Sequence, residues 1–301
     1  MCWGYLSVAR DLNHGPSYAH SQTYLLFISF YTKKIPSDFL EGDFDIIAII
    51  FLLGSCSKDN EDTLVGEGKL VVEFDNVFGD ANLILDTQSN VTSEGETLKI
   101  SDVKYIISNI VLTKEDGTTF TYPKSQSYFL IDEANADTHE IELQKIPAGN
   151  YTKIKFGIGV DKTQFDLGAT GQGDFLTTAQ DAGMMWSWSA GYKFLLFEGM
   201  FTSSTVTTEA KFMVHTGQTG TDYNYTDVTL DLPTKALVRT TITPNVHLFT
   251  DVAKIIDGKN KVNLSDNNKV GVGAMIMGGT NLPLITANLS DVFTVNHVHN
   301  D

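Results

Sequence analysis

From Gly68 onward, hydrophobic and polar residues alternate along most of the chain. Leu70, Val72 and Phe74 are separated by the single residues Val71 and Glu73, and the same spacing recurs over residues 151–160. Side chains that alternate in this way point to opposite faces of a β-strand, one facing a core and the other facing solvent. The pattern therefore predicts strands that each bury one face.

Turn-forming residues separate this region into many short segments, which is typical of a sandwich or barrel. Only two stretches, 172–182 and 247–256, have a helical pattern, and no long helix is available to connect parallel strands. We therefore predict an all-β domain over residues 68–301, a single antiparallel β-sandwich with one or two short helices. The further predicted strands are 98–100, 103–112, 120–122, 128–131, 140–143, 193–201, 206–214, 227–232 and 236–246.

A short apolar segment precedes the domain. Residues 46–53 are an unbroken run of eight apolar residues, whereas a span of the bilayer needs about 20. The run fits the apolar region of a signal peptide. The following Gly54-Ser55-Cys56 completes a sequence that resembles the lipobox of bacterial lipoproteins. This resemblance implies that Cys56 carries a lipid, that residues 56–67 are a flexible tether, and that the lipid alone attaches the protein to a membrane.

Residues 1–55 form the predicted leader region, but their first part does not suit a signal peptide. Residues 39–45 are acidic, whereas a signal peptide begins with positive charge. The nearest basic residues, Lys33 and Lys34, lie over ten residues upstream of the apolar run. A misassigned start explains this pattern, and residues 1–55 are excluded from the prediction of the fold.

Composition excludes several classes of partner and site. The chain has 21 Lys and Arg against 37 Asp and Glu, a net charge of −16. This balance argues against nucleic acid, because phosphate backbones are bound by clustered basic residues. Both cysteines, Cys2 and Cys56, precede the predicted domain. The domain can therefore contain neither a disulfide nor a zinc site built from thiolates.

The most distinctive segment is residues 183–199, with the sequence GMMWSWSAGYKFLLFEG. Two of the three tryptophans, Trp186 and Trp188, follow Met184 and Met185 there. Together with KFMVHTG at 211–217, which contains His215, and NLSDVF at 288–293, this segment resembles the MbnP-like family. The resemblance runs over most of residues 68–301, and the block around the tryptophans is its most specific part.

Members of that family are β-rich envelope proteins associated with copper. The resemblance implies a copper-binding protein at the cell envelope, on the periplasmic face or the cell surface. In the family, a tryptophan of this block can be oxidised to kynurenine by a partner dihaem enzyme. Carried over, Trp186 is the oxidisable residue and His215 is the histidine. Some relatives have a histidine two residues after the modified tryptophan, and this chain has Trp188 there.

The residue types also fit copper without the family. Cu(I) binds thioether sulfur and imidazole, and the face of an indole attracts a cation. His297 and His299 would share one face of an extended strand. The predicted metal residues are His215, Trp186, Met184, Met185, Trp188, His297 and His299.

Each of these residues also has a purely structural explanation. Methionines beside tryptophans commonly fill a core, the tryptophans could pack a sandwich, and His215 could be a hydrogen-bonded core residue. The alternative function is a non-catalytic surface adhesion or glycan- or protein-binding module, using exposed aromatics such as Tyr223 and Tyr225. No catalytic motif is present, and we predict no enzyme. Proximity of a tryptophan to His215 would favour the metal site over the alternative.

Overall fold

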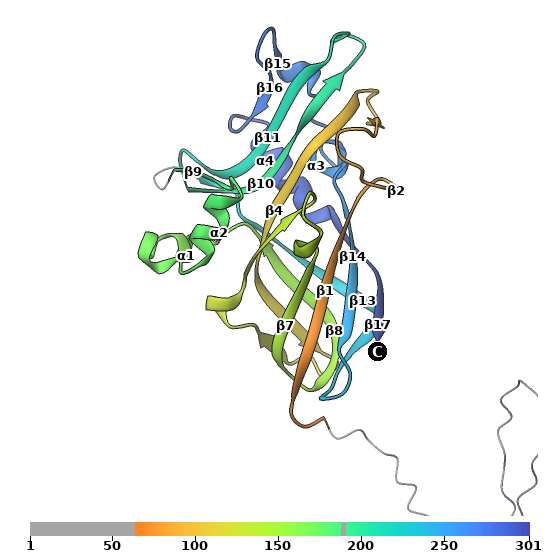
Figure 1. The fold of residues 1–301 in the computed structure, drawn as a ribbon, viewed down its shortest axis with the longest axis vertical. Coiled ribbons are helices and arrows are strands. Elements are labelled where there is room, and N and C mark those ends of the chain that lie inside the picture. The colour runs from red at the N-terminus through yellow and green to blue at the C-terminus, as the bar shows by residue number, and fades with distance from the viewer. Residues whose placement is uncertain (1–63, 188–190) are drawn as a thin grey trace, which may run out of the picture. The chain divides into compact units, whose positions relative to one another are not determined.

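Two curled β-sheets face each other in the computed structural model of the chain, which describes residues 64–187 and 191–301 (Figure 1). Strands make up most of these residues, and all of them belong to one compact unit. The predicted all-β, sandwich-like fold is confirmed.

The smaller sheet has five strands. Its order is β17 (Phe293–Asn300), β14 (Pro244–Asp251), β1 (Glu67–Phe78) and β2 (Ala81–Asn82), and β7 (Glu140–Pro147) also pairs with β1. The pairing of β1 with β14 is parallel. The prediction of a wholly antiparallel sandwich is therefore wrong in this detail, because alternation within a strand carries no information on the direction of its neighbour.

The larger sheet is built around the long strand β4 (Thr97–Lys114). The first half of β4 pairs with β10 (Gly191–Thr202) and its second half with β8 (Gly149–Ile158). The sheet continues from β8 to β13 (Thr226–Val238) and from β10 through β11 (Ala210–Thr219), β16 (Gly273–Ile276) and β15 (Asn268–Lys269), with β11 and β16 parallel. Short strands join its edges: β3 (Asn90–Val91), β5 (Thr119–Thr121), β6 (Tyr128–Asp132), β9 (Met185–Ser187) and β12 (Asp222–Tyr223).

Helices are few and short. The described residues form α1 (Lys162–Phe165), α2 (Phe175–Asp181), α3 (Lys254–Asp257) and α4 (Leu282–Asn288), and single 3-10 turns η1 (Lys124–Gln126), η2 (Ala136–Thr138), η3 (Ala169–Gly171), η4 (Ser265–Asn267) and η5 (Leu289–Asp291). None of these helices is long and apolar enough to cross a membrane.

One of the two predicted helices is confirmed and the other is wrong. The stretch 172–182 contains α2, but 247–256 begins in strand β14 and becomes helical only at α3. Val246 and Leu248 of β14 are buried, whereas His247 between them faces outward and is only partly buried. This alternation over the eight residues of β14 outweighs the weaker helical pattern that follows.

The main core lies between the two sheets. Phe74 of β1, Tyr105 of β4, Phe156 of β8 and Phe293 of β17 meet there, with ring centroids 5.1–6.2 Å apart. Such edge-on aromatic contacts add to the free energy gained by burying the rings.

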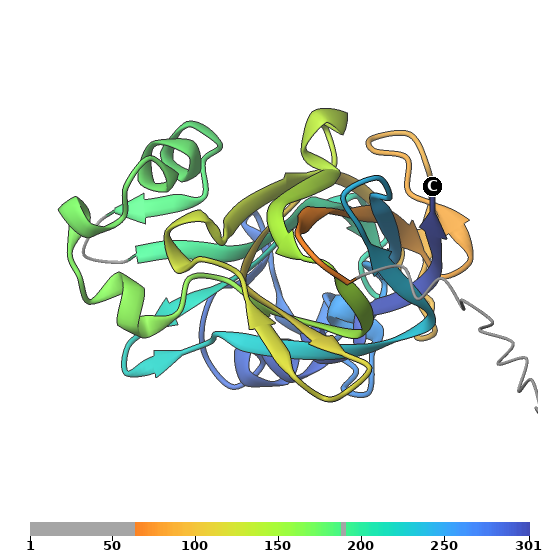
Figure 2. The ribbon, with the colours of Figure 1, turned by 90° about the horizontal axis from the view of Figure 1, so that it is seen from below.

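A second, smaller cluster lies on the opposite face of β4 and β10. It contains Met184, Tyr192, Phe194, Leu196 and residues of α2 and β4. The connection from β8 to β10, which carries α1 and α2, extends to one side of the domain (Figures 1 and 2). This connection ends in β9, which pairs with the start of β10 and so positions the segment around Trp186.

Candidate functional site

His215 is buried on β11 and contacts a carboxylate on the neighbouring strand. Strands β10 and β11 pair with Leu196 opposite His215 and with Glu198 opposite Met213. The Glu198 Oε1 atom lies 2.7 Å from Nε2 of His215, whose exposed fraction is 1%. Since a carboxylate accepts hydrogen bonds, Nε2 carries the proton and donates it to Glu198.

The other ring nitrogen of His215 has no hydrogen-bond partner among the described residues, although it is buried. Burial lowers the pKa of His215; the hydrogen bond to Glu198 opposes this shift, and the positive charge of Lys193 adds to it. The lowered pKa favours the neutral imidazole, in which Nδ1 has an unshared electron pair. Histidine ligands of metals are commonly held this way, with one nitrogen donating to a carboxylate and the other free for the metal.

Trp186 lies beside this imidazole. The centroid of its indole is 6.2 Å from that of His215, and the two ring planes are inclined by 48°. Trp186 is half-buried on β9. A β-carbon added at Gly217, two residues after His215, would lie 2.8 Å from Cζ3 of this indole. The indole thus occupies space that only a glycine at position 217 leaves open.

The predicted methionines are placed differently from one another. Met184 is fully buried in the second cluster with Leu196, the residue opposite His215, whereas Met185 is half-buried at its margin. Sequence reasoning did not single out Met213. It lies two residues from His215 on the same face of β11 and pairs with Met275 of β16, which is 40% exposed. Methionines from three segments, Met184, Met213 and Met275, are therefore carried by or packed against the strands around His215.

Unpartnered polar atoms are concentrated in the same part of the larger sheet. Besides Nδ1 of His215, Oγ1 of Thr216, Oε1 of Gln218 and Oδ1 of Asp102 are buried and have no hydrogen-bond partner among the described residues. Asp102 on β4 pairs with Glu198. Asp102 therefore lies on the face of the sheet that carries Glu198 and His215, whereas Thr216, which pairs with the core residue Leu195, lies on the other face. Buried polar groups normally have partners, so the unpartnered atoms on the His215 face indicate a place where a ligand or ordered water completes them.

His297 and His299 do not join this site. They lie on β17 of the smaller sheet, on the side of the domain opposite to β9, and they contact His247 of β14 instead (Figures 1 and 2). Sequence reasoning missed Glu198 and placed His247 at the start of a predicted helix. Its only available signal was their position in alternating segments, which does not tell which strands are neighbours.

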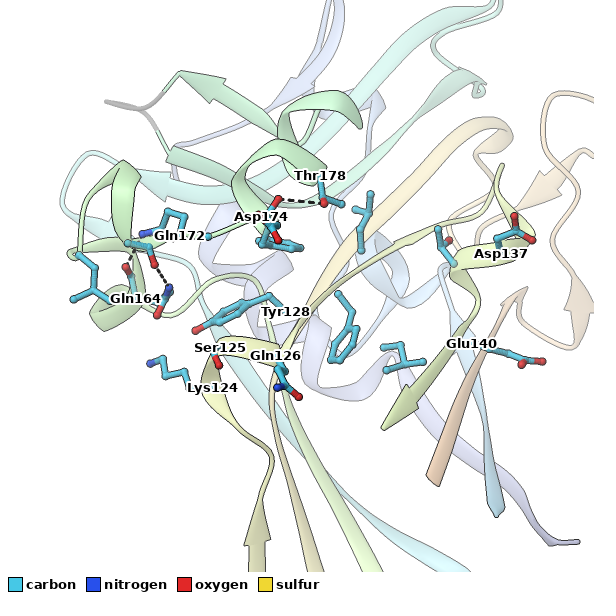
Figure 3. A pocket seen from close by; sticks show the side chains of 18 of the residues that line it. Lys124, Ser125, Gln126, Tyr128, Asp137, Glu140, Gln164, Gln172, Asp174 and Thr178 are labelled. Atoms are coloured by element: carbon cyan, nitrogen blue, oxygen red, sulfur yellow. Dashed lines mark hydrogen bonds between the residues drawn. The ribbon is translucent and has the colours of Figure 1, made fainter. Parts of the chain in front are cut away.

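A hollow of about 910 Å³ on the described surface lies between the α1–α2 connection and strands β6 and β7. Tyr128, Phe129 and Phe175 contribute aromatic rings to it. Lys124 lies near one end of the hollow, whereas Asp137 and Glu140 lie at the other (Figure 3). The hollow is wide and open, and none of the predicted metal residues lines it.

The tyrosines of the alternative function are not free at the surface. Tyr223 and Tyr225 are partly buried; the hydroxyl of Tyr223 donates to the carbonyl of Val160, and that of Tyr225 accepts from Asn109. The prediction that they are exposed binding residues is wrong, because their rings pack against the second cluster. Trp188 and Cys56 lie outside the described residues.

Within residues 64–187 and 191–301, no three histidine, cysteine, aspartate or glutamate side chains are arranged to hold a metal ion. A copper site at His215 would therefore depend on thioether or indole groups in addition to the imidazole. Cu(I) accepts such soft ligands, and both kinds are present near His215.

Two comparisons with known proteins gave a match, one with a solved structure and one with a family model. The solved structure of MbnP from Methylosinus trichosporium has 13% sequence identity and a TM-score of 0.41, over 70% of this chain and 81% of that one. A search of curated proteins finds no match. A family model described as MbnP matches residues 67–276, which include Trp186, Glu198 and His215 and end before β17. The chain therefore belongs to the MbnP family.

Proposed function

We propose that the protein binds copper at the cell envelope, without catalysis of its own, through a site centred on His215. One observation carries this proposal: Nε2 of the buried His215 donates a hydrogen bond to Glu198, while Nδ1, beside Trp186, has no hydrogen-bond partner among the described residues. A histidine that served only to pack the sheet would normally use both nitrogens or be replaced by an apolar residue.

The residues near His215 suit copper in its reduced form. The Nδ1 atom of His215 would be the nitrogen ligand, and Met184 or Met213 would supply thioether sulfur. The face of Trp186 would shield the ion from solvent and attract its charge. Copper is the cargo of this site, and Glu198 orients the imidazole and increases its basicity.

We further propose that Trp186 is the residue oxidised to kynurenine by a partner dihaem enzyme. Its position supports the proposal in two ways: it is half-buried, so part of the indole can be reached from outside, and it lies next to the proposed ligand. A polar group produced on this ring would face the site. Trp188 is the second candidate in the same block.

The place of action is also a proposal. A lipid on Cys56 would hold the domain at the membrane on a polar tether, on the periplasmic face or at the cell surface. The apolar run at 46–53 and the small residues before Cys56 support export and processing.

The test is Cu(I) affinity, measured by competition with a chromophoric chelator. We expect His215→Ala to weaken binding by about tenfold or more, since even the loss of an outer-shell partner commonly costs 10- to 100-fold. His139→Ala is the matched control, because His139 is a partly buried histidine that contacts the Asp132 carbonyl in another part of the domain. Equal Cu(I) affinity in both variants and the wild type would contradict the proposal.

The hollow in Figure 3 favours one alternative, the binding of a glycan or peptide. Its aromatic and amide side chains are of the types that contact sugars, and its volume of about 910 Å³ suits an extended ligand. Phe175→Ala and Gln126→Ala would reduce such binding and leave Cu(I) affinity unchanged. A glycan and peptide array probed with wild type and these variants separates the two functions.

A further inference from the structure

Three histidines meet on the outer face of the smaller sheet. Glu73 of β1 pairs with His247 of β14, which in turn pairs with His297 of β17, so that the three residues form one row across three strands. His299 follows two residues after His297 and faces the same way. Because the neighbouring residues Phe74 and Leu248 point into the core, this row points away from it.

The imidazole rings are in contact. The ring centroids of His247 and His297 are 4.7 Å apart, and those of His297 and His299 are 4.4 Å apart. The two Nδ1 atoms of His247 and His297 are separated by 3.5 Å. Carboxylates lie close on the other side, with Asp75 at 3.5 Å and Glu73 at 3.9 Å from Nε2 of His247.

We propose that His247, His297 and His299, together with the carboxylate of Glu73 or Asp75, form a second metal site that takes a divalent first-row transition-metal ion. Imidazole and carboxylate are the ligands that Zn²⁺ and Cu²⁺ share, and the order of affinities favours Cu²⁺ over Zn²⁺. The methionines that characterise the surroundings of His215 are absent from this row of residues, so the two sites differ in ligand type.

The three imidazole rings lie close together, but their nitrogens do not yet point at one common position for a metal ion. They meet edge to face, and the described residues contain no three such side chains already gathered around one point. Two nitrogens that lie about 2.0–2.1 Å from one tetrahedral ion are about 3.3 Å apart, close to the 3.5 Å between the Nδ1 atoms of His247 and His297. His299 is exposed, so its side chain can rotate to bring in a third nitrogen without disturbing the core.

The surroundings of the row favour a cation. Asn245, opposite His299, donates to Glu73 and orients its carboxylate. The carbonyl oxygen of the Asn245 side chain is buried and has no partner within residues 64–187 and 191–301. The carboxylates of Glu73 and Asp75, both within 4 Å of His247, supply negative charge that attracts a cation.

The second site is independent of the proposed function. The MbnP family model ends at residue 276, so His297 and His299 lie outside the matched region. A bound ion would connect β14 and β17, and through Glu73 also β1. Since it would bind only the folded arrangement, it would stabilise the strand at the edge of the sheet.

The test is a calorimetric titration of the purified protein with Zn²⁺ alone, repeated with His297→Ala and His299→Ala. We expect one Zn²⁺ per wild-type chain and affinities weakened about tenfold or more in both variants. Both side chains lie on the outer face, so neither substitution should disturb the core. The melting temperature measured without metal checks that each variant is folded. Zn²⁺ should raise the melting temperature of the wild type and not that of His297→Ala. With Cu²⁺ bound, the electron paramagnetic resonance spectrum of the wild type should show couplings to the imidazole nitrogens. The His297→Ala variant should show fewer of these couplings.

His139→Ala and His215→Ala are the controls, and both should retain Zn²⁺ binding. Unchanged Zn²⁺ affinity in His297→Ala and His299→Ala would overturn the inference, as would an equal loss in His139→Ala. Failure of Cu(I) binding at His215, with Zn²⁺ binding at the three histidines intact, would contradict the proposed function and leave this inference standing.

Discussion

The indole of Trp186 lies so close to the backbone of Gly217 that a β-carbon at position 217 would collide with the ring. The added atom would lie 2.8 Å from Cζ3 of the ring and 2.5 Å from the carbonyl oxygen of Tyr192. Gly217 also has a φ of +155°, which disfavours other residues. The indole therefore approaches the backbone of β11 directly, two residues from His215, and this approach places it beside the proposed ligand.

Gly217→Ala should displace Trp186 and also disturb the pairing of β11 with β10 beside Tyr192. We expect a red-shifted tryptophan emission, because the ring moves into water, and Cu(I) affinity weakened by about tenfold through loss of its packing. Gly220→Ala is the matched control, since Gly220 also has positive φ but no atom within 4 Å of an added β-carbon. If both variants shift the emission equally, the cause is backbone strain and not contact with Trp186.

Glu198→Gln should weaken Cu(I) binding about 10- to 100-fold while keeping a hydrogen-bond acceptor for His215, because a neutral amide does not increase the basicity of the imidazole. The same variant should lower the pKa of His215 further, since the hydrogen bond to Glu198 raises that pKa. Nuclear magnetic resonance of the imidazole measures the pKa directly. Glu209→Gln, which removes an exposed carboxylate paired with Lys99, should change neither quantity.

Asp161 should make the fold sensitive to acid. It begins α1 and accepts hydrogen bonds from Lys124, Thr163, Tyr128 and Asn109. Burial alone would raise the pKa of Asp161, but these hydrogen bonds together lower it well below its usual value. The folded state thus binds fewer protons than the unfolded state, so the stabilisation is complete above the ordinary aspartate pKa of 3.8 and is lost as the pH falls below it.

Urea unfolding of Asp161→Asn measures this contribution. We expect a free energy of unfolding lower by roughly 1–3 kcal/mol at pH 7 and a smaller decrease than the wild type shows between pH 5 and pH 3. Asp166→Asn, which removes an exposed carboxylate paired with Lys162, should follow the wild type. A wild-type and an Asp161→Asn curve with the same pH dependence would show that Asp161 does not set it.

Cys56→Ser should release the protein from membranes when it is expressed in a bacterium that processes lipoproteins. We expect this release because the lipid on Cys56 is the only attachment to the membrane that we propose. Fractionation and mass spectrometry of the N-terminus measure the outcome, with Cys2→Ser as the control. Membrane association that persists in Cys56→Ser would contradict lipid anchoring at this residue.

The strands could be predicted from the sequence because their alternation is local. Leu70, Val72 and Phe74 are buried as their spacing predicts. The neighbours of each strand could not be predicted in the same way, because pairing joins segments far apart in the chain. The parallel pairing of β1 with β14 is one example, and it is also what places Glu73 beside His247.

The candidate site was predictable by residue type more than by geometry. The block around Trp186 and the histidine at 215 are distinctive in the sequence, but Glu198 is one of 37 acidic residues in the chain. The contact of Glu198 with His215 depends on the register of β10 and β11. In that register Glu198 lies opposite Met213, two residues before His215. His247 was assigned to a helix for a related reason: the stretch after it forms α3, and the helical pattern of that stretch obscured the end of β14.

The most direct test of copper binding at His215 is the intact mass and copper content of the protein purified from its native host, compared with His215→Ala from the same host. The account predicts about one copper per wild-type chain, a mass change matching conversion of one tryptophan to kynurenine at Trp186, and loss of the copper in His215→Ala. An unmodified wild-type protein that holds no copper under reducing or oxidising conditions would contradict it.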